Sequence, residues 1–81
     1  MVKVRTSERF ERVLDKIDKS ISIQLEKLIV KIINNPEIGK PMRYDRKGTR
    51  EVYVGSFRLS YAYDKTNDIL YLVDIYHKDK Q

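Results

Sequence analysis

The sequence predicts an α+β fold in which two helices pack on one face of an antiparallel sheet. Three observations support this prediction. Helical periodicity in residues 6–33 gives way to two-residue alternation from residue 51 onward. The break between the two helical stretches is short, which favours an αα-hairpin. The last stretch, ILYLVDIY, is apolar on both parities, as in a central strand that is covered on both faces or nearly so.

Residues 2–17 are expected to contain one strand and one helix. Val2 and Val4 alternate with charged residues, which indicates a short N-terminal strand. Thr6 and Ser7 are suitable N-caps for the first helix, and its apolar stripe begins at Phe10. The stripe continues with Val13, Leu14 and Ile17.

A second helix is expected from Ser20, a possible N-cap, to the segment Asn34-Asn35-Pro36, where the proline ends it. Its apolar stripe consists of Ile21, Leu25, Leu28, Ile29, Ile32 and Ile33. Residues 36–49 contain two prolines and two glycines, so we expect a loop there.

Three strands follow and complete a β-α-α-β-β-β order in a single domain over residues 1–81. The segments EVYVG, FRLSYAY and ILYLVDIY form an antiparallel meander with turns at Gly55-Ser56 and at DKTND. With the N-terminal strand at its edge, this meander makes a four-stranded sheet. Alternation turns Phe57, Leu59 and Tyr61 toward the helices and Arg58 toward the opposite, open face.

Composition excludes several classes of protein. The 81 residues include no cysteine and one histidine, so a disulfide scaffold, a cysteine-based zinc site and a histidine-rich metal centre are excluded. We expect no metal and no cofactor. The N-terminus has no apolar signal region, and no apolar run is long enough to span a bilayer. A cytoplasmic protein is therefore expected.

The net charge of +5 is concentrated in the middle of the chain. Residues 39–51 contain five Lys or Arg against two Asp or Glu. Such a segment favours binding of phosphates or of an acidic partner protein. The alternative is a solvated loop that serves solubility.

Arg58 and His77 are the candidates for chemistry. RNA cleavage by internal attack needs proton transfer and a cation that stabilises the phosphate. Histidine suits the first task and arginine the second, because arginine grips a phosphate with two parallel donors. If both side chains lie on the open face, they share one pocket. The alternatives are an exposed tail residue for His77 and an ion pair with Asp74 or Glu51 for Arg58.

The segments VGSFRLSY and DIYHKD, after a helical region ending in NNPEIGKPM, resemble the RelE/ParE superfamily of type II toxin–antitoxin toxins. Members with this kind of tail resemble ribosome-dependent mRNA endonucleases of the RelE, YoeB and YafQ type. The resemblance implies that Arg58 binds the scissile phosphate and that His77 transfers a proton. The predicted RNA-binding residues are Lys40, Arg43, Arg46, Lys47, Arg50 and Lys78. The implied partners are mRNA on the ribosome and a small antitoxin with acidic residues.

The chain departs from this pattern at two positions. Glu51 and Tyr53 stand where many members carry basic residues. Two alternatives therefore remain open. One is a non-catalytic toxin of the ParE branch, which shares the fold and poisons DNA gyrase. The other is a degenerate toxin that only binds its antitoxin.

Overall fold

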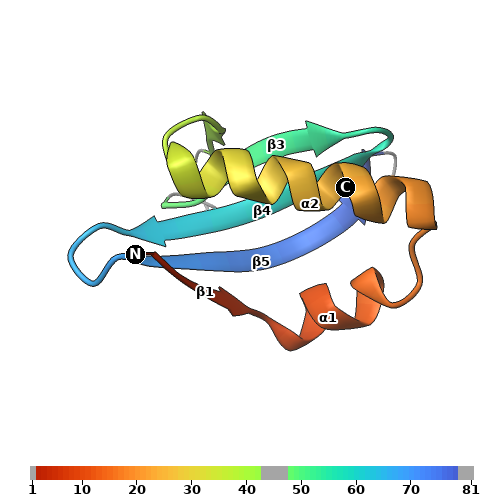
Figure 1. The fold of residues 1–81 in the computed structure, drawn as a ribbon, viewed down its shortest axis with the longest axis horizontal. Coiled ribbons are helices and arrows are strands. Elements are labelled where there is room, and N and C mark those ends of the chain that lie inside the picture. Colours follow the sequence, from red (N-terminus) through yellow and green to blue (C-terminus); the bar gives the residue numbers. More distant parts are fainter. Residues whose placement is uncertain (1, 43–47, 79–81) are drawn as a thin grey trace.

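The computed structural model describes residues 2–42 and 48–78 of the chain. Its elements are β1 (Lys3–Thr6), α1 (Glu8–Leu14), α2 (Lys19–Asn34), β2 (Lys40–Pro41), β3 (Arg50–Val54), β4 (Phe57–Asp64) and β5 (Ile69–His77). The strands form one sheet in the order β1-β5-β4-β3-β2 (Figure 1). The predicted α+β fold is confirmed. The predicted count of four strands is wrong, because a short segment of the expected loop pairs with β3 as β2.

Strand β1 lies at one edge of the sheet, as predicted, and runs parallel to β5. The remaining neighbours are antiparallel, so the predicted meander of β3, β4 and β5 is also confirmed. Gly55 has a φ of +57° at the turn between β3 and β4, a backbone conformation that costs glycine little. The chain thus starts at the β1 edge and reaches the β2 edge after the two helices.

Local capping determines where both helices begin. The Oγ of Ser7 accepts a hydrogen bond from the backbone N–H of Phe10, so Ser7 is the N-cap of α1, as predicted. Helix α2 begins earlier than predicted, because Asp18 and not Ser20 is its N-cap. Asp18 Oδ1 accepts a hydrogen bond from the backbone N–H of Ser20, and Asp18 Oδ2 accepts one from the Ser20 hydroxyl.

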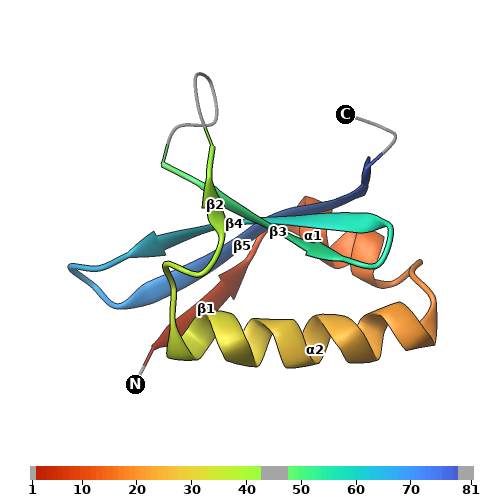
Figure 2. The ribbon, with the colours of Figure 1, turned by 90° about the horizontal axis from the view of Figure 1, so that it is seen from above.

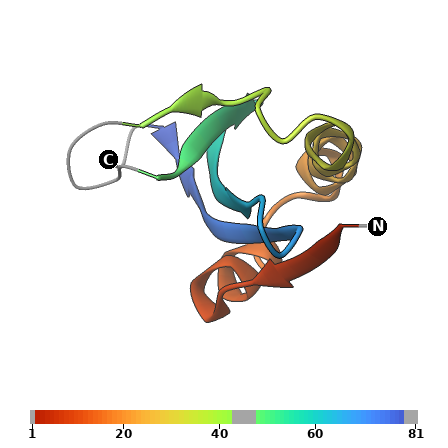
Figure 3. The ribbon, with the colours of Figure 1, turned by 90° about the vertical axis from the view of Figure 1, so that its left-hand side faces the viewer.

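The apolar core lies between the helices and one face of the curved sheet. Helix α1 packs against β5, and α2 lies over β3 on the concave side (Figures 2 and 3). The buried apolar side chains are Phe10, Leu25, Ile32, Val54, Leu59, Tyr61, Leu70, Leu72 and Ile75. Phe57, Leu14 and Leu28 pack against this cluster. The predicted orientation of Phe57, Leu59 and Tyr61 toward the helices is therefore confirmed.

Tyr61 ties the segment before β2 to the core. Its buried hydroxyl donates to the carbonyl oxygen of Pro36 and accepts from the backbone N–H of Gly39, each at 2.8 Å. Burial raises the pKa of the Tyr61 phenol. Arg50 adds two contacts from Nη1, to the carbonyl oxygens of Glu37 at 3.2 Å and Gly39 at 2.8 Å. These contacts place β2 beside β3.

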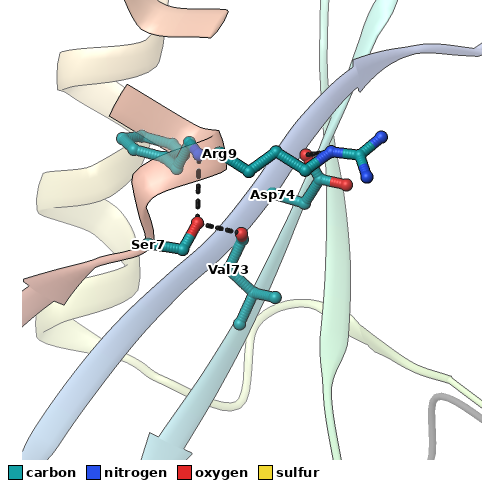
Figure 4. A network of polar contacts seen from close by, with 5 residues as sticks. Ser7, Arg9, Val73 and Asp74 are labelled. Carbon is teal, nitrogen blue, oxygen red and sulfur yellow. Dashed lines mark hydrogen bonds and ion pairs between the residues drawn. The ribbon is translucent and has the colours of Figure 1, made fainter. Parts of the chain in front are cut away.

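A β-bulge interrupts the pairing of β4 with β5. Ser60 pairs with Asp74 while Tyr61 pairs with Leu72, which leaves Val73 as the extra residue on β5. The hydroxyl of Ser7 donates to the carbonyl oxygen of Val73 at 2.5 Å (Figure 4). The same serine therefore caps α1 and holds the bulge.

The bulge changes which side chains of β5 point toward the helices. Leu72 and Ile75 are both buried although they are three positions apart, because the extra residue reverses the alternation between them. On the other face, Tyr71 and Val73 are 41% and 37% exposed. The prediction that this strand is covered on both faces, or nearly so, is therefore wrong: the sheet has a helix side and a helix-free side.

Candidate functional site

Arg58 lies on the helix-free face of the sheet, as predicted. Its neighbours on β4, Phe57 and Leu59, belong to the helix side, and its partners across the sheet are Tyr53 on β3 and Tyr76 on β5. The guanidinium carbon is 5.2 Å from the centroid of the Tyr53 ring. The Arg58 side chain is 23% exposed, so the guanidinium is only partly accessible.

The carboxylate of Glu51 connects Arg58 to Tyr76. Arg58 Nη1 lies 3.4 Å from Glu51 Oε1, and the Tyr76 hydroxyl donates to Glu51 Oε2 at 2.5 Å. The Glu51 side chain is only 5% exposed. A carboxylate removed from water in this way needs such partners, because an unpaired buried charge is costly. We call Glu51, Arg58 and Tyr76 the glutamate cluster.

His77 lies on the other side of β5 from Arg58. It pairs with Phe57 across the strands, and the two rings meet edge-on with their centroids 5.5 Å apart. The His77 side chain borders a cavity of about 270 Å³. The lining of this cavity consists of Arg9, Val13, Phe57, Ile75, Tyr76 and His77.

The expectation that Arg58 and His77 share one pocket on the open face is therefore wrong. Uninterrupted alternation from Leu72 would have turned His77 toward the helix-free face. The bulge at Val73 adds one residue, so Tyr76 and not His77 stands opposite Arg58.

The bulge that decides this is held by α1. Besides the Ser7 contact, Arg9 Nε lies 3.2 Å from Asp74 Oδ1 (Figure 4). The Asp74 oxygen is buried, and it accepts no hydrogen bond from the residues that the structure describes, so the pairing with Arg9 rests on charge. Asp74 is thus engaged by Arg9, and the predicted alternative of an Arg58–Glu51 pair is the one that forms.

Of the six predicted RNA-binding residues, the three that the structure describes do not all lie on one face of the sheet. Lys40 is exposed and stands opposite Glu51, so it shares the helix-free face with Arg58. Arg50 has the other orientation and binds backbone carbonyls beside the end of α2. Lys78 is exposed just after β5, and its backbone N–H donates to the Ser56 carbonyl. Arg43, Arg46 and Lys47 lie outside the described residues.

The polar residues around the end of α2 line a separate cavity of about 380 Å³. Its lining consists of Asn34, Asn35, Pro36, Glu37, Gly48, Arg50, Tyr63 and Lys65. A hydrogen bond to Asp68 is the main cause that raises the pKa of Tyr63. Because Arg50 and Tyr63 are already bound to protein groups, this cavity does not add to the charge on the Arg58 face.

Neither a metal centre nor a membrane span is found in the described part of the chain. Among residues 2–42 and 48–78, no three His, Cys, Asp or Glu side chains are grouped as metal ligands would be. Over the same residues, no helix has the length and apolar character needed to cross a bilayer.

Comparison with known proteins identifies the family. Residues 4–81 match the family model described as the ParE toxin of the type II toxin–antitoxin system parDE. The chain belongs to the ParE toxin family. It is the toxin component of a type II toxin–antitoxin system. Among curated proteins, none matches the sequence of this toxin significantly.

Solved structures show the same fold at low sequence identity. The RelBE2 toxin–antitoxin complex from Mycobacterium tuberculosis matches with a TM-score of 0.84 and 24% identity, over 95% of this toxin and 98% of that chain. The intact Escherichia coli RelBE complex matches at 0.80 and 17%, over 93% and 94%. A YoeB/ParE toxin from Agrobacterium tumefaciens matches at 0.85 and 14%, over 94% and 98%. The predicted membership in the RelE/ParE superfamily is confirmed.

Sequence reasoning did not predict that Tyr76 stands opposite Arg58, and it considered Glu51 only as an alternative ion-pair partner. A signal for Glu51 was present, because a tight turn at Gly55-Ser56 pairs Tyr53 with Arg58 and puts Glu51 on the same face. No comparable signal existed for Tyr76, since its orientation depends on the bulge.

Proposed function

We propose that this toxin is an endoribonuclease that cleaves mRNA on the ribosome. The observation that carries the proposal is the position of Arg58 on the helix-free face, beside the Tyr53 ring and with exposed Lys40 on the same face. Cations along one face suit a phosphate backbone, and aromatic rings can stack on unpaired bases. Activity on ribosomes also requires the cytoplasmic location that the sequence predicts.

The reaction that suits this site is internal attack. The ribose 2′-oxygen bonds to the neighbouring phosphorus and loses its proton, while the bond from phosphorus to the 5′-oxygen breaks and that oxygen gains a proton. Arg58 stabilises the negative charge that grows on the phosphate. His77 remains the predicted proton-transfer residue. Because it lies across β5 from Arg58, it reaches the reacting atoms only around the end of that strand.

Cleavage of mRNA on programmed ribosomes by the purified toxin tests the proposal. Arg58→Lys keeps the positive charge but loses the planar pair of donors, and we expect its cleavage rate to fall by on the order of 10²-fold. Arg58→Ala is a poorer variant, because it leaves the buried Glu51 carboxylate without its ion-pair partner. His77→Ala tests the proton-transfer prediction, and circular dichroism checks folding of each variant. Wild-type toxin that leaves mRNA intact would overturn the proposal.

The second candidate is non-catalytic binding to DNA gyrase, as in the ParE branch. Two observations favour it: the family model that matches is that of ParE, and the Glu51 carboxylate pairs with Arg58 and offsets its charge. A supercoiling assay with purified gyrase separates the two candidates. Growth arrest with inhibited supercoiling and intact mRNA would favour this one.

We also propose that a small antitoxin with acidic residues inhibits this toxin. The solved structures that share its fold include complexes of RelE toxins with their antitoxins. The net charge of +5 favours an acidic partner. Co-expression with the product of a short adjacent reading frame tests this: it should co-purify with the toxin and relieve growth arrest.

A further inference from the structure

The glutamate cluster puts a negative charge where the proposed function needs a positive one. Glu51 is a strand residue with a 5% exposed side chain, and both of its carboxylate oxygens are engaged by groups on the helix-free face. A carboxylate beside a phosphate-binding arginine weakens phosphate binding by repulsion. If Glu51 contributes to the function of the toxin, it therefore does so in a way other than by strengthening RNA binding.

The contacts point to control of orientation. An arginine side chain loses rotamer freedom when it is fixed in one position, which costs free energy at the moment when a ligand orders it. Glu51 Oε1 and the Tyr53 ring hold the Arg58 guanidinium from two directions before any RNA arrives. A guanidinium has five N–H donors, so an ion pair through Nη1 does not exhaust it.

The second carboxylate oxygen of Glu51 also fixes the orientation of a side chain on β5. The Tyr76 hydroxyl bonds to Oε2, and Tyr76 stands directly opposite Arg58 across β4 and β5. One carboxylate thereby holds a cation and a phenol from two adjacent strands at the same point of the sheet. The bulge at Val73 is what brings the phenol to this face.

We propose that Glu51 is a positioning residue, which holds Arg58 and Tyr76 in the arrangement needed for phosphate chemistry and weakens RNA binding in return. The inference rests on the proposed endoribonuclease function. It predicts opposite effects on two quantities: loss of the Glu51 charge slows the chemical step and strengthens the binding of RNA.

Single-turnover cleavage with toxin in excess over programmed ribosomes separates these quantities. The rate at saturating toxin reports the chemical step, and the half-saturating concentration reports binding. For Glu51→Gln we expect the saturating rate to fall by on the order of 10²-fold, the effect of a small misplacement of a catalytic group. The half-saturating concentration should fall, because the repulsion between the Glu51 carboxylate and the RNA phosphate is removed. Tyr76→Phe removes only the hydroxyl and should slow the saturating rate less than Glu51→Gln does.

Glu26→Gln is the matched control. Glu26 is exposed on α2, and its substitution changes the net charge by the same amount. It should leave the saturating rate at the wild-type value. Circular dichroism and thermal unfolding of each variant show whether it is folded at the assay temperature.

Three outcomes would overturn the inference. An unchanged saturating rate in folded Glu51→Gln, with only a lower melting temperature, means that Glu51 is merely structural. A faster saturating rate means that Glu51 restrains Arg58 and inhibits the reaction. Wild-type toxin that does not cleave overturns the proposed function and this inference together, whereas cleavage by wild type with an unaffected Glu51→Gln overturns this inference alone.

Discussion

Replacing Tyr61 by phenylalanine removes only the hydroxyl group, yet it should destabilise this toxin strongly. Tyr61 is fully buried, and its hydroxyl both donates to the Pro36 carbonyl and accepts from the Gly39 backbone N–H. Phenylalanine leaves the ring in place and deletes both hydrogen bonds. The Gly39 N–H is then left buried without its partner.

The magnitude follows from these two bonds. Each contributes about 1 kcal/mol net, and an unsatisfied buried donor costs about 1–3 kcal/mol more, partly offset because phenylalanine is the more apolar side chain. We therefore expect a loss of about 2–3 kcal/mol in the free energy of unfolding. For a domain of this size, about 1 kcal/mol shifts the melting temperature by about 4–8 °C. The melting temperature should fall by about 8–24 °C.

Urea unfolding followed by far-UV circular dichroism measures this loss. Tyr71→Phe is the matched control, since Tyr71 is on the neighbouring strand and 41% exposed, and its substitution should cost about 0.5 kcal/mol or less. If Tyr61→Phe costs no more than Tyr71→Phe, the hydroxyl does not anchor the segment before β2, and the reasoning is refuted.

Three further predictions concern stability and charge. Gly39→Ala should also lower the melting temperature, because an added Cβ would lie 2.7 Å from the Tyr61 hydroxyl oxygen, and a melting temperature equal to wild type would contradict the close approach. The pKa of Tyr61 is raised in the folded state, so its contribution to stability is complete below its ordinary pKa of about 10 and is lost as pH rises through the folded value. Urea titrations from neutral to alkaline pH should therefore show a steeper loss in wild type than in Tyr61→Phe, and equal slopes would assign the loss to other groups. Reversing the charges of the basic loop should weaken ribosome or RNA association and flatten its salt dependence, because phosphate contacts release counterions, whereas an unchanged salt titration would leave this loop a role in solubility only. The residues reversed together are Arg43, Arg46 and Lys47.

The order of elements and the composition of the core were predictable because they depend on local periodicity. Helical spacing identified the buried stripes, including Phe10, Leu25 and Ile32, and two-residue alternation identified the buried face of β4. Ser7 was predictable as a cap because capping involves only neighbouring residues. Strand β2 was missed because its two residues carry no periodicity, and its pairing depends on contacts with Tyr61 and Arg50.

The candidate site likewise has one part that the sequence predicted and one part that it did not. The sequence alone determined the face on which Arg58 lies, because no irregularity interrupts the alternation from Phe57 to Tyr61 on that strand. Only the tertiary structure decided that Tyr76, and not His77, stands opposite Arg58. The extra residue at Val73 is held by the Ser7 hydroxyl, which lies 66 positions away in the sequence. A contact over that separation is invisible to any local pattern, yet it reverses the orientation of every side chain that follows it in the strand.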